Sequence, residues 1–166
     1  RYPYWAWENG AYYAVTKAFA RSTAADDNEA RGLIHLIQLG RDAQDNEQWH
    51  LMLITDLMKH KGMKIDWLRG VFLPRIMALK YYYLTRLMYA INPAWSFAMN
   101  ARFESHAEHE YMKMVRNHPE WEEEPVDSPY FDFYPRQATV ADLFRRIGLD
   151  ERDHMIESID EYERVT

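Results

Sequence analysis

The order of apolar and polar residues along the chain predicts helices throughout. No segment has a convincing period-two alternation of the kind found in strands, and glycine and proline are few, at 6 and 7 residues. Long helices with short connections in a chain of 166 residues indicate an all-α protein, an antiparallel bundle of about four core helices. The predicted helices cover residues 4–20, 29–61, 65–90, 94–117 and 139–164.

The breaks between these helices fall at recognisable signals. Gly62 stands where a C-terminal cap is expected, and Thr139 to Asp142 resembles a capping box that opens the last helix. Small polar residues predict a loop over 21–28, and four prolines predict an ordered loop over 118–138. Within the longer segments, Gly40 is a candidate interruption and Pro74 bends or begins the third helix.

Residues 71–91 mix apolar and aromatic side chains with the cations Arg75, Lys80 and Arg86. Three cations in this stretch are too many for an ordinary membrane-spanning helix. Such a helix either lies in a membrane interface or packs in a core with its long cations directed outward. The pattern alone leaves both alternatives open.

The amino-acid composition limits the kinds of functional site that the chain can form. The chain has no cysteine, which excludes disulfides, thiolate zinc sites, iron–sulfur clusters and cysteine nucleophiles, so any metal must be held by His, Asp and Glu. A net charge of −6 argues against a nucleic-acid partner. The 12 Tyr, 6 Trp and 9 Met indicate an interface with lipid, cofactor or partner. No targeting segment is recognisable.

Two of the seven histidines follow a glutamate by three residues, in the pairs Glu47/His50 and Glu151/His154. Residues i and i+3 share a helix face, so each pair can reach one metal ion. The helix predicted over 94–117 adds Glu104. Ferritin-like di-iron bundles use Glu-x-x-His on two helices and one Glu from each of the other two. Candidates for five of these six ligands are present, and carboxylates with imidazoles suit iron or manganese.

The sequences around these residues resemble the alternative oxidases. Residues 46–51, Asn-Glu-Gln-Trp-His-Leu, are similar to the family's Asn-Glu-x-x-His-Leu motif, and residues 150–154 are similar to its Asp-Glu-x-x-His motif. Glu104-Ser105-His106-Ala107 with Tyr111 resembles the third metal motif in its plastid terminal oxidase form. The opening residues 1–6 also resemble a segment of the plastid form. The resemblance covers nearly the whole chain and is weakest across 118–138.

The resemblance implies a monotopic membrane enzyme that oxidises plastoquinol or ubiquinol and reduces O2 to water at two iron ions. Asn46 and Asp150 would orient ligands by hydrogen bonds, and Tyr111 would lie beside the irons as an electron or hydrogen-atom donor. It also implies a ferritin-like four-helix bundle with interface helices in the plastid thylakoid, or else in the mitochondrial inner membrane. The implied metal ligands are Glu47, His50, Glu104, Glu151 and His154.

One departure from the family keeps alternatives open. The family's first ligand, the Glu of a Leu-Glu-Thr motif, would fall four positions before Arg1. The sequence is therefore expected to be a single domain, residues 1–166, that lacks an N-terminal part, and Glu8 is an imperfect substitute about three helical turns along. A homologue that has lost activity, such as an oxidase-like subunit of a larger membrane complex, is the alternative. A ferritin-like quinone-ring hydroxylase shares the ligand set, and a homodimer is also compatible with the sequence.

Overall fold

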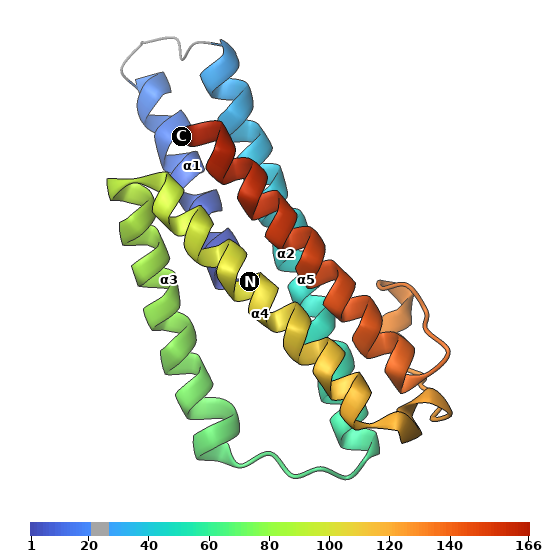
Figure 1. The fold of residues 1–166 in the computed structure, drawn as a ribbon. Coiled ribbons are helices and arrows are strands. Elements are labelled where there is room, and N and C mark those ends of the chain that lie inside the picture. Colours follow the sequence, from blue (N-terminus) through green and yellow to red (C-terminus); the bar gives the residue numbers. More distant parts are fainter. Residues whose placement is uncertain (21–26) are drawn as a thin grey trace. The chain divides into compact units, whose positions relative to one another are not determined.

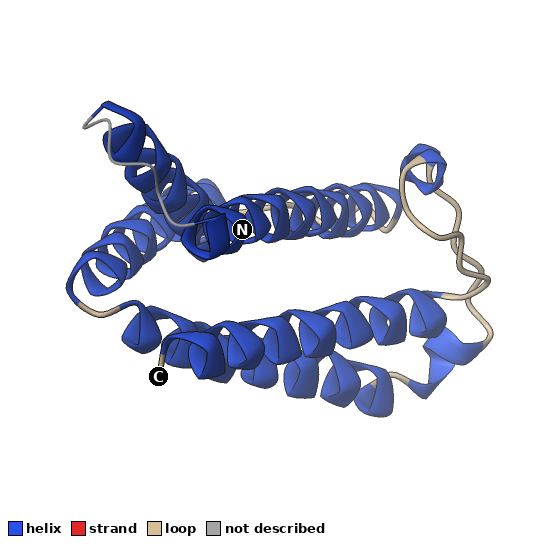
Figure 2. Cartoon of the chain, turned by 90° about the horizontal axis from the view of Figure 1, so that it is seen from above, coloured by secondary structure: helices blue, strands red, loops and turns tan. Residues whose placement is uncertain are grey.

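The computed structural model describes residues 1–20 and 27–166, which are mostly α-helical (Figures 1 and 2). No strand occurs within these residues, which confirms the all-α prediction. Residues 21–26 of the loop predicted over 21–28 lie outside the described residues. The last two residues of that predicted loop, 27 and 28, belong to a helix. The helices are α1 (Tyr2–Ala20), α2 (Asp27–His60), α3 (Leu73–Ile91), α4 (Pro93–Asn117) and α5 (Val140–Val165).

The described chain divides into two compact units. The first unit contains Arg1–Asp45 and Ile65–Ser96, and the second contains Asn46–Lys64 and Phe97–Thr166. Helices α2 and α4 therefore contribute residues to both units, while α1 and α3 belong to the first and α5 to the second. That the chain is a single domain stays a prediction.

In the first unit, two glycines allow helices to approach closely. A Cβ added at Gly10 in α1 would lie 2.6 Å from the ring of Tyr89 in α3. A Cβ added at Gly40 in α2 would lie 3.0 Å from the backbone oxygen of Tyr4 in α1. The predicted interruption at Gly40 is wrong, because α2 runs unbroken from Asp27 to His60. The glycine serves helix packing, since any side chain there would meet the neighbouring backbone.

Helix α3 buries little of its surface. Among its residues only Thr85 is buried, and most of its large apolar side chains are exposed. The helix follows a π-helical turn, Leu68–Phe72, and has Pro74 in its first turn, which agrees with the expectation that the helix begins near this proline. None of the helices in the described part of the chain combines the length and the apolarity needed to cross a membrane.

The core of the second unit joins α2, α4 and α5 to the proline-rich segment. Leu53 of α2 packs with Leu143 and Ile147 of α5, and Phe131 and Tyr134 complete this cluster from the connecting segment. That segment was predicted as an ordered loop. It contains two short 3-10 helices, Pro119–Glu122 and Pro129–Asp132. It is ordered because its aromatic side chains are part of the apolar core.

Both caps predicted for the long helices are present. Gly62 has a φ of 65°, and its backbone N–H and that of Met63 donate to the carbonyls of Lys59 and Met58, both at 2.9 Å. This pair of hydrogen bonds is a Schellman motif and ends α2. The Thr139 hydroxyl accepts from the backbone N–H of Asp142 at 3.1 Å and begins α5.

We predict that Thr139→Ala lowers the free energy of unfolding by about 1 kcal/mol, because an N-terminal N–H of α5 loses its partner. Urea unfolding followed by circular dichroism measures this loss. Thr139→Ser is the matched control and keeps the hydroxyl, so its midpoint should stay near that of the unmodified protein. Equal midpoints for the Ala and Ser variants would contradict the prediction.

Candidate metal centre

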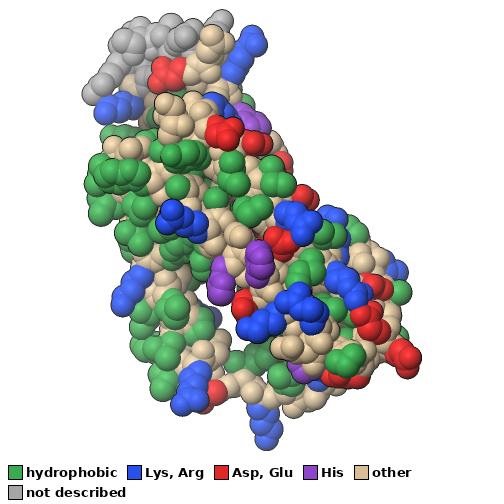
Figure 3. Space-filling view, viewed as in Figure 1, with side chains coloured by type: hydrophobic (Ala, Val, Ile, Leu, Met, Phe, Trp, Pro, Cys, Tyr) green, Lys and Arg blue, Asp and Glu red, His purple; other side chains and the backbone are tan. Residues whose placement is uncertain are grey.

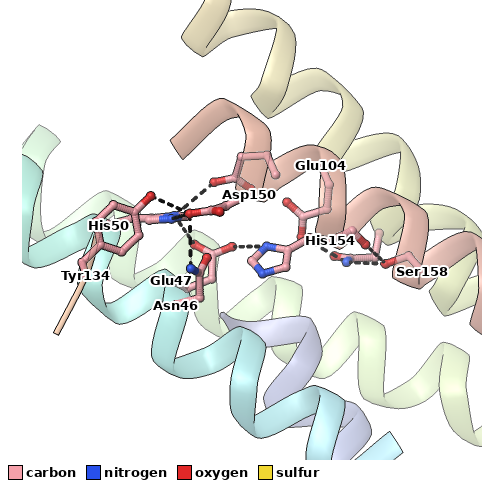
Figure 4. Close-up of polar contacts among 10 residues, drawn as sticks. Asn46, Glu47, His50, Glu104, Tyr134, Asp150, His154 and Ser158 are labelled. Carbon is pink, nitrogen blue, oxygen red and sulfur yellow. Dashed lines mark hydrogen bonds and ion pairs between the residues drawn. The ribbon is translucent and has the colours of Figure 1, made fainter. Parts of the chain in front are cut away.

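The five predicted ligands all lie in the second unit, on three of its helices (Figure 4). Helix α2 carries Glu47 and His50, α4 carries Glu104, and α5 carries Glu151 and His154. The spacing of three residues places both members of each Glu/His pair on one helix face. Helical geometry therefore directs the five side chains to one region.

Four of these side chains form a group able to hold a metal ion. One ligand atom from each of Glu47, Glu104, Glu151 and His154 lies within 4.8 Å of the other three. Glu104, Glu151 and His154 are buried, and Glu47 is half-buried. His154 Nδ1 is 3.7 Å from a carboxylate oxygen of Glu47. Three carboxylates so close together repel one another unless a cation or protons lie among them.

His50, the fifth predicted ligand, lies beside this group without belonging to it, and its contacts test whether the site fits a metal. Its Nε2 lies 3.0 Å from an oxygen of Asp150, while its buried Nδ1 lies 3.4 Å from Glu151 and 4.0 Å from Glu47. Within the described residues this Nδ1 has no hydrogen-bond partner. When Nε2–H donates to Asp150, Nδ1 presents a lone pair near two carboxylates that can also only accept. A cation among them resolves that conflict, so the donor set fits a metal.

In the absence of a metal, a proton on His50 balances part of this negative charge. Burial is the largest influence and lowers the pKa of His50. The hydrogen bond to Asp150 and the nearby carboxylates of Glu151 and Glu47 outweigh burial and raise the pKa to about 9. Burial also raises the pKa of Glu151, but the neighbouring side chains of His50 and Glu104 leave that pKa below its usual value. The cluster thus attracts positive charge at neutral pH.

Asp150 is the centre of a hydrogen-bond network behind His50. Its carboxylate accepts from Asn46 at 3.3 Å and from the hydroxyl of Tyr134 at 2.5 Å, and it pairs with Arg146 at 2.5 Å. The structure thus places Asn46, Asp150 and His50 in one network, and the role of Asn46 and Asp150 in orienting ligands stays a prediction. A carboxylate that receives the outer N–H of a metal-binding imidazole fixes its orientation.

Two members of this network were not predicted from the sequence. Tyr134 lies in the proline-rich segment, and no motif marks it, since only the fold brings it to Asp150. Its ring also meets that of His50 edge to face, with centroids 5.6 Å apart. Arg146 carries a weak signal, because it precedes Asp150 by four residues on one helix.

Tyr111 lies on α4 and is partly buried between the apolar clusters of the second unit. Its ring packs against Phe144 with centroids 5.9 Å apart. Burial raises the pKa of Tyr111, and the negative charges of Glu151, Glu47 and Glu104 raise it further. The phenol therefore stays protonated at neutral pH, within the electrostatic influence of the cluster.

Glu8 does not join the metal-binding group found among the described residues. It lies in the first unit, where its carboxylate accepts from Arg41 at 3.2 Å and from Gln44 at 2.8 Å. These bonds link α1 to α2. Glu8 is thus engaged in helix packing.

Comparison with known proteins assigns the family. A family model described as alternative oxidase matches residues 27–158. The chain belongs to the alternative oxidase family. Proteins of this family are membrane-associated and act in general as di-iron quinol oxidases. The matched range includes the five side chains described above and leaves α1 outside. No curated protein and no solved structure matches the chain.

We predict that Tyr134→Phe lowers the unfolding free energy of the metal-free protein by about 1 to 3 kcal/mol, the usual worth of a hydrogen bond to a charged group. Urea unfolding in the presence of a chelator measures it. Tyr130→Phe is the control, because Tyr130 packs against the same apolar cluster and lies in the same segment. A loss as large in Tyr130→Phe as in Tyr134→Phe would argue against the Asp150 hydrogen bond as the cause.

Proposed function

We propose that this chain is a di-iron quinol oxidase that couples the oxidation of two membrane quinols to the reduction of one O2 to two waters. The observation that carries the proposal is the cluster of three carboxylates and an imidazole, all buried except the half-buried Glu47, whose ligand atoms lie within 4.8 Å of one another. Carboxylates with imidazoles are donors typical of iron. Each quinol gives two electrons and two protons, so two quinols balance the reaction.

In this proposal the carboxylates of Glu47, Glu104 and Glu151 would hold two iron ions, and His50 and His154 would each hold one of them. Iron bound there would supply electrons to O2 and recover them from quinol. The negative ligands offset the positive charge of the metal ions inside an apolar unit. The group of four side chains and the position of His50 beside Glu151 support this assignment.

Asp150 and Asn46 would act through His50. Asp150 holds the proton of His50 Nε2, which leaves Nδ1 to face the carboxylates. Tyr134 and Arg146 in turn hold Asp150. This arrangement keeps the imidazole in one tautomer and one orientation while the electron count of the site changes.

Tyr111 is proposed as a donor of a hydrogen atom during oxygen reduction. Its phenol keeps its proton because burial and three nearby carboxylates raise its pKa. An electron that leaves such a phenol must be accompanied by the proton, since the buried cationic phenol is strongly disfavoured. The O–H group therefore supplies both particles together.

We further propose that the first unit lies on a membrane surface and that the substrate is plastoquinol in a plastid thylakoid. The plastid-like sequence from Glu104 to Tyr111 supports the substrate and the location. Exposed apolar side chains over α3, interspersed with Lys and Arg, support the membrane surface (Figure 3). A helix of this kind buries its apolar side chains in the lipid boundary and extends its cations to the headgroups. The large exposed apolar side chains of the π-helical turn and α3 are Leu68, Phe72, Leu73, Met77, Leu79, Tyr83, Leu84, Leu87 and Ile91.

We expect cyanide-resistant, quinol-driven oxygen uptake by the iron-loaded protein in detergent, and we expect Glu104→Ala to abolish it. Glu104 is buried in the carboxylate cluster, so its loss removes a ligand. Glu110→Ala on the same helix is the control, because Glu110 forms an exposed ion pair with Lys113 at 3.2 Å and does not belong to the metal-binding group found among the described residues. It should leave uptake near the unmodified rate.

Product analysis in the same assay separates the alternatives. Quinone without added oxygen atoms supports the oxidase, while a hydroxylated quinone ring would indicate a hydroxylase. No uptake by the well-folded, iron-loaded full-length protein would contradict the oxidase proposal and favour an oxidase-like subunit without catalysis.

For the membrane surface, we predict that Leu84→Glu with Leu87→Glu reduces binding to anionic liposomes by about tenfold or more. Both leucines are exposed on α3, and burial of a leucine contributes roughly 1.5 to 3 kcal/mol. Flotation of the purified protein with liposomes measures the bound fraction. Met114→Glu introduces a charge at an exposed apolar residue of the second unit and should float like the unmodified protein. Unchanged flotation of the double variant would contradict the proposal.

A further inference from the structure

Two fully buried polar side chains lie next to the proposed ligands without belonging to them. Asn100 on α4 and Ser158 on α5 are each 0% exposed. Asn100 precedes Glu104 by four residues, and Ser158 follows His154 by four, so each lies one turn from a ligand on its own helix. Polar groups this deeply buried destabilise a fold unless they are hydrogen-bonded.

These side chains form a chain of hydrogen bonds between the two helices. The Ser158 hydroxyl donates to the carbonyl of His154 at 2.9 Å. The amide Nδ2 of Asn100 donates to Ser158 Oγ at 3.0 Å and to Glu104 Oε1 at 3.0 Å. Figure 4 shows Ser158 beside His154, with Glu104 nearby. All four residues belong to the second unit.

The direction of every bond in this chain is fixed by chemistry. A backbone carbonyl can only accept, and Glu104 Oε1 accepts from the Asn100 amide. The single proton of Ser158 is used at the carbonyl of His154, so its oxygen must accept from Asn100. Both amide protons of Asn100 are then committed, one to Ser158 and one to Glu104. Rotation of the amide by half a turn would place its oxygen against two acceptors, so only one orientation is stable.

We infer that Asn100 is a positioning residue that holds the Glu104 carboxylate for iron, and that Ser158 sets the orientation of the Asn100 amide. This inference rests on the proposed function, in which Glu104 is a ligand. A donated hydrogen bond occupies a lone pair of Oε1 and restrains rotation of the carboxylate. Oε2 is then the oxygen better able to bind metal.

The same chain of bonds couples two ligands on different helices. Glu104 on α4 is connected through Asn100 and Ser158 to the backbone of His154 on α5. The spacing of these ligands is thereby held by protein groups and does not depend on the metal alone. A site held in this way before iron arrives does not spend binding free energy on ordering its ligands.

The chain offers a closely matched control for this inference. Ser96 is also 0% exposed, and its hydroxyl donates to the carbonyl of Pro93 at 2.8 Å. Its oxygen accepts from Trp7 Nε1 at 3.1 Å, just as Ser158 accepts from Asn100. Ser96→Ala therefore removes the same kind of buried hydroxyl, without touching the bonds to Glu104 or His154.

The test compares Asn100→Leu, Ser158→Ala and Ser96→Ala in the full chain. The rate of iron release to a chelator compares how tightly each variant binds the metal. The Mössbauer spectrum of the iron-loaded protein reports the ligand environment of the iron. Urea unfolding of the metal-free proteins measures the purely structural cost. We expect iron release about ten- to a hundredfold faster in Asn100→Leu, with an altered quadrupole splitting. Ser158→Ala should shift both readouts in the same direction by less.

Ser96→Ala should lose unfolding stability but keep the iron release and the spectrum of the unmodified protein. A folded Asn100→Leu with unchanged release and spectrum would overturn the inference. If Asn100→Leu does not fold, Ser158→Ala decides, and an unchanged spectrum there would overturn it equally. An unmodified chain that binds no iron would instead overturn the proposed function, so the two failures are distinguishable.

Discussion

Mutual repulsion among closely spaced carboxylates is the constraint around which the second unit is organised. Glu47, Glu104 and Glu151 lie together, the last two buried and Glu47 half-buried, and like charges this close cannot all remain ionised without compensation. A proton on His50 provides part of the compensation, since Asp150, Glu151 and Glu47 outweigh the effect of burial and raise the pKa of His50 to about 9. Metal cations satisfy the same requirement with the ligand geometry already assembled. The cluster is thus stable only when positive charge balances its carboxylates. The same requirement favours the binding of iron ions.

Support for the cluster comes largely from the helices that carry it. Asn46 and Asp150 each precede a glutamate by one residue, whereas Asn100 and Ser158 lie one turn from Glu104 and His154. A helix that positions a ligand therefore positions its hydrogen-bonding partner as well. The bonds themselves run between helices, from α2 to α5 through Asp150 and from α4 to α5 through Ser158. Packing and ligand orientation consequently depend on the same contacts.

The sequence was sufficient to predict what depends on local spacing. Gly62 and Thr139 were found because a cap is a signal of a few residues, and the Glu/His pairs were found because a helix repeats every 3.6 residues. The sequence did not predict the role of Tyr134 or the bond between Asn100 and Ser158, because these contacts join residues distant in the chain. A single sequence does not show which residues of two helices lie side by side. The wrong prediction of a helix interruption at Gly40 has the same origin. A glycine is needed there because the backbone of another helix lies close to it, and the sequence does not show that neighbour.

The two tyrosines of the second unit show how similar electrostatics can lead to different roles. Burial raises the pKa of both Tyr111 and Tyr134, so both phenols remain protonated. The proton of Tyr134 is committed to Asp150 at 2.5 Å, and its removal would release the carboxylate that orients His50. The pKa of Tyr111 is raised by the charges of the carboxylate cluster itself, so its O–H is coupled to the charge of the site. A change of charge at the cluster therefore alters the ease of removing a proton from Tyr111.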